Sequence, residues 1–250
     1  MTEGASGPQA RLADMDAMGV DQSLLYPTWF AEGFFLVRDP DVAYALARAY
    51  NDWIADFCKA ALQRLFGATI LPLQNMDFAL EELQRVARIP SFRAVFIRPV
   101  FVEDRYLNHP YYEPLLIGFT VMERYPAMKV VVAHGKAAWM QEVLEKMEAS
   151  TRVIPLLHHS PVSTEPEEMW EHGNVMLGFD AEERLIQKLP QDFAAKVVWG
   201  SRYPHHDATS AWDAIARLRG ANVPEPLSAR MMGQNAAVQF GIEPVPETVA

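Results

Sequence analysis

The chain has 250 residues and a mass of 28.2 kDa, enough for a sizeable hydrophobic core without disulfide or metal crosslinks. Its net charge of -10 opposes binding to nucleic acid, and no Lys/Arg block offsets that charge locally. The single cysteine, Cys58, excludes an internal disulfide. The first residues lack a signal-peptide pattern and no apolar run is long enough to span a bilayer. We therefore predict a cytoplasmic protein with neither membrane nor nucleic acid as a partner.

Short β-branched runs alternate with longer amphipathic segments along the chain, which is typical of βαβ units with a parallel sheet. The apolar runs predict strands over residues 23–26, 68–71, 94–97, 130–133, 175–178 and 197–200. Between them, apolar residues at three- and four-residue spacing predict helices, among them 41–65, 77–88 and 136–148. This order favours an α/β fold, a TIM-type (β/α) barrel that is incomplete by two strands. We predict one domain over residues 1–250, with loose termini at 1–12 and 243–250.

Four predicted strands run directly into polar or turn-forming residues. These strand ends are Tyr26-Pro27, Arg98-Pro99, His134-Gly135 and Ser201-Arg202. Because the carboxyl ends of parallel strands meet at one face, where sites are built, we expect the functional residues there.

Six segments, in order along most of the chain, carry a family resemblance. They are MGVDQSLLYPT (18–28), YNDWIADFCKAALQRLFGATILPLQ (50–74), FRAVFIRP (92–99), ERYPAMKVVVAHG (123–135), VVWGSRYPHHD (197–207) and MMGQNAAVQFGI (231–242). Together they resemble the amidohydrolase-2 branch of the amidohydrolase superfamily, which includes aminocarboxymuconate-semialdehyde decarboxylase. The resemblance implies a barrel with one divalent metal ion at the carboxyl ends of its strands.

The chain departs from that family at the metal ligands. The family's His-x-His pair at the first strand would precede this sequence, and its middle-strand His has no counterpart between YYEPL (111–115) and ERYP. Arg202 stands where the family has the Asp of a G-[ST]-D-Y-P motif. A guanidinium is permanently charged and repels a divalent cation. The sequence therefore predicts no cofactor; the alternative is Zn or Mn on a rearranged set of His134, His205 and Asp207 or Asp180.

His134 and Arg202 are the candidate catalytic residues. His134 ends a strand where the family keeps a histidine for proton transfer, and a near-neutral pKa suits general acid/base work. The alternative is a histidine that only hydrogen-bonds across the barrel mouth. Arg202 offers a fixed cation for a substrate carboxylate or enolate, or else forms a salt bridge to Asp180 or Asp207 that closes the site.

Five further residues are candidate substrate contacts, each with a structural alternative. Arg98 ends a strand, in an FIRP context that is also found in the family. Tyr26 and Trp29 belong to an aromatic stretch that lines a pocket or else replaces missing core. His158 heads an irregular loop, as a lid residue or an exposed one, and His205 contacts substrate or anchors its own loop.

These residues support three hypotheses for function. The first is a metal-independent lyase or cyclase that decarboxylates, dehydrates, isomerises or cyclises a small anionic or carbonyl-bearing substrate, aromatic substrates included. The second is a non-catalytic pseudoenzyme or partner subunit. The third is a metal-dependent hydrolase or decarboxylase with rearranged ligands. Because an open barrel leaves strand edges uncovered, we expect a homo-oligomer or a heteromeric partner under each of the first two.

Overall fold

The computed structural model describes residues 3–98, 102, 105, 111, 129–133, 135–153, 168, 170–171 and 175–245. The chain forms two compact units, unit 1 (Met1–Gly118 with Glu243–Ala250) and unit 2 (Phe119–Ile242). Each unit contains its own three-stranded parallel sheet, in the orders β1-β2-β3 and β4-β5-β6. The six predicted strands are therefore confirmed, while the prediction of a single domain stays a prediction.

The sheet of unit 1 consists of β1 (Ser23–Leu25), β2 (Leu65–Ile70) and β3 (Phe92–Phe96). All six residues of the central strand β2 are buried, as expected for a strand covered on both faces. A side chain at Gly67 would be tightly packed, because a Cβ at this position would lie 3.1 Å from Ile54 Cγ1 and 3.2 Å from Phe92 Cε1. The pairing of β2 with β3 also shifts register between Gly67 and Ala68.

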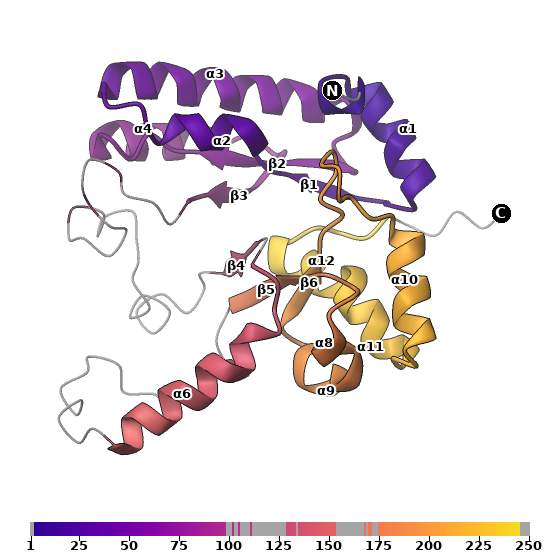
Figure 1. Cartoon of the computed structure of the whole chain (residues 1–250). Helices are drawn as coiled ribbons and strands as arrows, with labels where there is room; N and C mark the ends of the chain where they lie inside the picture. Colours follow the sequence, from indigo (N-terminus) through magenta and orange to yellow (C-terminus); the bar gives the residue numbers. More distant parts are fainter. Residues whose placement is uncertain are drawn as a thin grey trace. The chain divides into compact units, whose positions relative to one another are not determined.

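The helices of unit 1 are α1 (Pro8–Met18), α2 (Thr28–Phe34), α3 (Pro40–Cys58) and α4 (Met76–Val86). The Asp39 carboxylate caps α3 by accepting the N–H groups of Asp41 and Val42, and the Asn75 side chain caps α4. Helix α3 packs on β2, and Figure 1 shows α3 and α4 on the same side of the sheet. Cys58 is buried at the end of α3, and burial raises the pKa of its thiol to about 12.

Two sequence-based boundaries in unit 1 are corrected. The helix predicted over 41–65 ends at Cys58, a short 3-10 turn (Lys59–Ala61) follows, and β2 begins at Leu65 rather than at residue 68. Leu65 and Phe66 continue the apolar spacing of the helix, so periodicity alone does not separate the two elements. Residues 8–12, predicted as part of a loose terminus, begin α1, in which Arg11 and Met15 are buried. Residues 243–245 lie in no helix or strand, and 246–250 lie outside the described residues.

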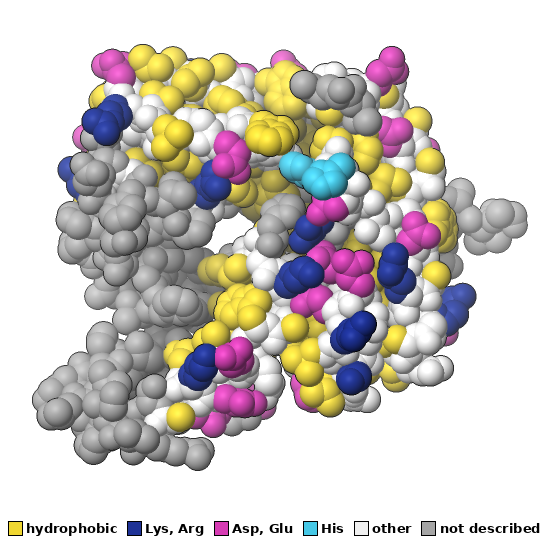
Figure 2. All heavy atoms as spheres, viewed as in Figure 1, with side chains coloured by type: hydrophobic (Ala, Val, Ile, Leu, Met, Phe, Trp, Pro, Cys, Tyr) yellow, Lys and Arg dark blue, Asp and Glu magenta, His cyan; other side chains and the backbone are white. Residues whose placement is uncertain are grey.

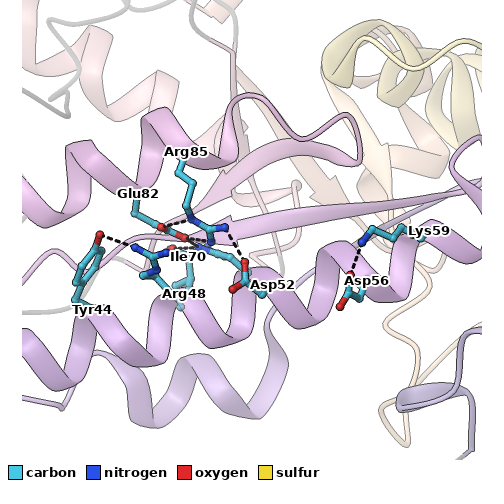
Figure 3. A network of polar contacts seen from close by, with 9 residues as sticks. Tyr44, Arg48, Asp52, Asp56, Lys59, Ile70, Glu82 and Arg85 are labelled. Atoms are coloured by element: carbon cyan, nitrogen blue, oxygen red, sulfur yellow. Dashed lines mark hydrogen bonds and ion pairs between the residues drawn. The ribbon is translucent and has the colours of Figure 1, made fainter.

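A buried polar network joins α3 and α4 to the end of β2 (Figure 3). The Asn51 amide donates to the carbonyl of Ile70 at 3.0 Å and to Glu82 Oε1 at 2.7 Å, while Asn51 Oδ1 accepts the Ile70 N–H at 3.0 Å. Arg85 donates to both Glu82 oxygens at 2.7 Å and to Asp52 at 2.7 Å. Asn51 and Glu82 are 0% exposed, so this network contributes to stability only while each partner is satisfied.

The sheet of unit 2 consists of β4 (Val130–Val132), β5 (Val175–Phe179) and β6 (Val197–Trp199). Its described helical segments are α6 (Trp139–Val153), α8 (Arg184–Lys188), α9 (Pro190–Phe193), α10 (Ala211–Gly220), α11 (Glu225–Ala229), a π-helical turn η5 (Arg230–Gln234) and α12 (Asn235–Phe240). Figure 1 shows α6 leading away from these strands. The core forms around Leu177, Phe179 and Met231. The buried Asn235 amide donates to the carbonyls of Ala194 and Val197, which attaches α12 to β6.

Among the described helices, none is both long enough and apolar enough to cross a membrane.

Candidate functional site

Four charged side chains meet at the carboxyl edge of the unit 2 sheet. Lys136 lies in the loop after β4, Asp180 directly follows β5, and Arg202 and Asp207 lie in the loop after β6. The three strands are parallel and adjacent, so their following loops emerge at the same edge. Local sequence therefore sets the charges, and the pairing of the strands brings them together.

Arg202 is the centre of this cluster. Its Nη1 donates to Asp207 Oδ2 at 2.5 Å and its Nη2 donates to Asp180 Oδ2 at 3.1 Å. The side chains of Arg202 and Asp180 are 27% and 19% exposed. A guanidinium has several further N–H groups, and these donate to no acceptor in the part of the chain that the structure describes. Arg202 therefore forms the salt bridges that one sequence-based alternative predicted. It also keeps guanidinium N–H groups that could donate to a ligand.

Lys136 belongs to this charged cluster and was not among the residues that the sequence indicated. Its Nζ lies 3.8 Å from Asp180 Oδ2, so Asp180 lies between two cations. Lys136 and Arg202 also share a left-handed backbone, with φ of 60° and 58°. Non-glycine residues rarely adopt this conformation, and such strain gathers at functional sites. The signal in the sequence was the position of Lys136 just after the AHG turn; its pairing with Asp180 required the fold.

The electrostatics of the cluster perturb two pKa values. The hydrogen bond to Asp207 is the main cause that raises the pKa of Arg202 above its usual value. Reciprocally, the hydrogen bond from Arg202 lowers the pKa of the exposed Asp207 carboxyl. Arg202 therefore stays charged across the physiological range, and Asp207 stays ionised to lower pH than an isolated aspartate.

Replacing Arg202 tests this coupling directly. In Arg202→Met we expect the pKa of Asp207 to rise toward its ordinary value, because the donor that stabilises the carboxylate is gone. In the wild type, the Asp207–Arg202 ion pair stabilises the fold at pH values above the pKa that Asp207 has in the unfolded chain. This stabilisation is lost as the pH falls through the lowered pKa of Asp207 in the folded chain. Carboxyl carbon NMR titration measures this, with Arg217→Met as the matched control. An unchanged Asp207 titration in Arg202→Met would contradict the assignment.

The histidines predicted for the site divide into described and undescribed residues. His205 lies in the turn after Arg202: its N–H donates to the Arg202 carbonyl at 2.9 Å, and its own carbonyl accepts the Ala208 N–H at 3.1 Å. Figure 2 shows histidine side chains beside acidic and basic ones, and the described histidines are His205 and His206. His134 and His158 lie outside the described residues.

The remaining predicted substrate contacts belong to unit 1. Tyr26 follows β1 and its ring lies 6.0 Å from that of Phe96, while Arg98 follows β3 and forms an ion pair with Glu32 of α2. Burial raises the pKa of Tyr26 to about 12, so its phenol is a hydrogen-bond donor rather than a base at neutral pH. These residues lie at the carboxyl edge of the unit 1 sheet, a different sheet from that of Arg202.

The aromatic stretch of unit 1 divides between core and surface. Phe34 and Phe35 are 2% and 5% exposed and belong to the hydrophobic core, whereas Trp29 is 78% exposed. Phe30 stacks on Tyr50 at 5.1 Å between ring centroids. The core alternative therefore describes Phe34 and Phe35, while a pocket lined by Tyr26 and Trp29 stays a prediction.

The described residues do not by themselves fit a divalent metal ion. No group of three or more His, Cys, Asp or Glu side chains that could hold one occurs within the described ranges. Asp180 and Asp207 are both bound by Arg202, and an ion on either carboxylate would lie close to a permanent positive charge.

Comparisons with known proteins find similar folds among solved structures. No protein-family profile and no curated protein sequence matches the chain. Among solved structures, it is similar to 5-carboxyvanillate decarboxylase from Sphingomonas paucimobilis, with 22% identity, a TM-score of 0.75, and coverage of 93% of this chain and 82% of that one. It is also similar to an amidohydrolase from Mycobacterium avium subsp. paratuberculosis, with 18% identity, a TM-score of 0.76, and coverage of 96% and 75%.

A third similar structure contains a metal. It is a variant of 5-carboxyvanillate decarboxylase from Novosphingobium aromaticivorans with bound manganese and 3-methoxy-4-hydroxy-5-nitrobenzoic acid. It shares 19% identity and a TM-score of 0.77, and the match covers 92% of this chain and 80% of that one.

The comparisons confirm the fold and correct one prediction. The chain has the incomplete (β/α)-barrel fold that the sequence predicted, and its structural neighbours include an amidohydrolase and decarboxylases. The prediction of a site without a cofactor is wrong in the light of the bound manganese in a similar decarboxylase. That prediction rested on ligands missing from the sequence pattern, and a pattern does not show which other side chains a fold brings to an ion.

Proposed function

We propose that this protein is a lyase that decarboxylates a small aromatic carboxylic acid. The observation that carries the proposal is the Lys136–Asp180–Arg202 cluster at the carboxyl edge of a parallel sheet, where folds of this type hold their sites. Its two cations suit a carboxylate or phenolate, the groups such substrates bear. The likeness to decarboxylases of aromatic acids supports this reaction over dehydration, isomerisation or cyclisation.

The reaction itself assigns roles to the residues. The bond between the ring carbon and the carboxyl carbon breaks, CO₂ leaves, and the electron pair remains on the ring carbon, which then takes up a proton. Arg202 and Lys136 bind and orient the anionic substrate, with His205 and His158 kept as proposed contacts. The roles of Tyr26, Trp29 and Arg98 stay predictions from the sequence. His134, which follows β4 in the sequence, is the proposed proton donor because imidazole titrates near neutral pH.

A divalent metal is the cofactor that the manganese-containing neighbour supports. A metal ion would supply electrophilic stabilisation of negative charge on the substrate. Because Arg202 binds Asp180 and Asp207, the ligands would have to come from other side chains. The cytoplasmic location and the oligomeric state stay predictions.

The test combines metal content with turnover. Protein purified without chelator is analysed by elemental mass spectrometry and incubated with 5-carboxyvanillate or salicylate, with CO₂ release as the readout. We expect turnover of at least one acid, its loss after chelation, and its recovery with Mn²⁺. Absence of turnover in Mn²⁺-treated protein would overturn the proposal in favour of a non-catalytic protein. Turnover that survives complete metal removal would overturn the role of the metal.

A further inference from the structure

Glu183 is a buried carboxylate beside the charged cluster, and it has no role in the proposed reaction. It lies just before α8 and is 7% exposed. Most glutamates on protein surfaces are solvated, and a buried one requires partners that satisfy its oxygens. The partners of Glu183 are backbone groups of two different loops.

Three N–H groups donate to this one side chain. Oε2 accepts the N–H of Ala137 at 3.0 Å and that of Ala138 at 2.9 Å. Oε1 accepts the N–H of Asp180 at 2.8 Å, and the Glu183 N–H donates back to the Asp180 carbonyl at 3.0 Å. Bonds from N–H groups to a carboxylate are stronger than bonds between neutral groups.

These contacts join the loop after β4 to the loop after β5. Ala137 and Ala138 stand between Lys136 and the first residue of α6, Trp139, so their N–H groups point from a helix N-terminus toward the carboxylate. Lys136 adjoins Ala137, which is 0% exposed, and has a left-handed backbone that the surrounding bonds must hold in place. The same carboxylate therefore fixes the backbone of Lys136 on one side and of Asp180 on the other.

We propose that Glu183 is a positioning residue that sets the spacing of Lys136, Asp180 and, through Asp180, Arg202 for binding of the substrate anion. This inference rests on the proposed function of the cluster. Without the carboxylate, the N–H groups of Ala137, Ala138 and Asp180 lose their acceptor and the two loops separate. Displacements near 1 Å at a binding site are enough to weaken it many-fold.

The test uses Glu183→Gln with Glu182→Gln as the matched control. The amide keeps the length of the side chain but presents an N–H group to N–H donors. Glu182 adjoins it in sequence, is 57% exposed and lies 4.0 Å from Arg217. Amide exchange at Ala137 and Ala138, the Kd of salicylate, and kcat and KM for the acid turned over are measured for the wild type, for these two variants and for Glu183→Asp. A second variant, Glu183→Asp, keeps the charge on a side chain one methylene shorter.

In Glu183→Gln we expect faster exchange at Ala137 and Ala138, and a Kd and a KM raised on the order of tenfold with kcat changed far less. Contacts to a carboxylate that loses its charge as CO₂ departs contribute mainly to ground-state binding, which is why KM responds more than kcat. The amide exchange rates, Kd and KM of Glu183→Asp should change in the same direction, and those of Glu182→Gln should match the wild type.

The outcomes separate this inference from the proposed function. Faster exchange with an unchanged Kd would show a purely structural Glu183 and overturn the inference, as would wild-type values in both Glu183 variants. Salicylate binding by the wild type without turnover of either acid would refute the decarboxylase proposal, and the Kd values would still decide the role of Glu183. A wild type that does not bind salicylate would overturn the inference.

Discussion

Replacing Arg202 by Met is expected to raise KM for the aromatic acid by on the order of 10- to 100-fold, because a charge-assisted contact to the substrate anion is lost. The variant should fold, since Asp180 keeps Lys136 at 3.8 Å and Asp207 is 43% exposed. The KM of Arg202→Lys should lie between those of the wild type and Arg202→Met, because lysine keeps the charge but not the planar guanidinium that binds two oxygens. Steady-state kinetics with CO₂ release measures this.

The control for Arg202 is Arg217→Met, the same chemical change in the same unit. Arg217 is 54% exposed and lies 4.0 Å from Glu182, so its loss should leave KM within about twofold of the wild type. Equal KM values in Arg202→Met and the wild type would show that Arg202 is held by Asp180 and Asp207 and does not bind substrate. That result would overturn the proposed role of Arg202.

The second large effect is on stability. Glu82→Ala is expected to lower the free energy of unfolding by about 3–5 kcal/mol, because removal of one partner leaves the others of a buried charged network unpaired. Glu82 is 0% exposed; without it, Arg85 loses both bonds to the carboxylate and the Asn51 amide loses one acceptor. Denaturant titration followed by circular dichroism measures the change.

Asp52→Asn provides the comparison within the same network. Asp52 accepts from the same Arg85, at 2.7 Å, but its side chain is 59% exposed. Exposed ion pairs contribute about 0–1 kcal/mol, so this variant should be nearly as stable as the wild type. A loss below about 1 kcal/mol in Glu82→Ala would show that the network reorganises or hydrates without cost.

Particular elements show where the sequence sufficed for the fold. The runs at 130–133 and 197–200 are short, apolar and β-branched, and both form strands because such residues suit a covered parallel sheet. The boundary at Leu65 was wrong because an apolar strand directly after an amphipathic helix continues its spacing. The prediction of a loose N-terminus was wrong for residues 8–12, because the burial of Arg11 and Met15 depends on contacts distant in sequence.

The site divides in the same way. Sequence identified Arg202 and its two possible partners, because a polar residue after a buried strand lies at a predictable edge. It missed Lys136 and Glu183, because neither residue type nor spacing indicates which loop a buried carboxylate reaches across. It also led to the wrong prediction that no cofactor is needed.

The sequence by itself therefore determined the composition of the strands, their order in βαβ units and the charges at their ends, since these follow from local hydrophobicity and spacing. Only the tertiary structure decided that β4, β5 and β6 are neighbours, that Asp180 lies between two cations, and that Glu183 links their loops. The physical reason is that strand pairing and burial are set by the free energy of the whole core, to which residues distant in the chain contribute together.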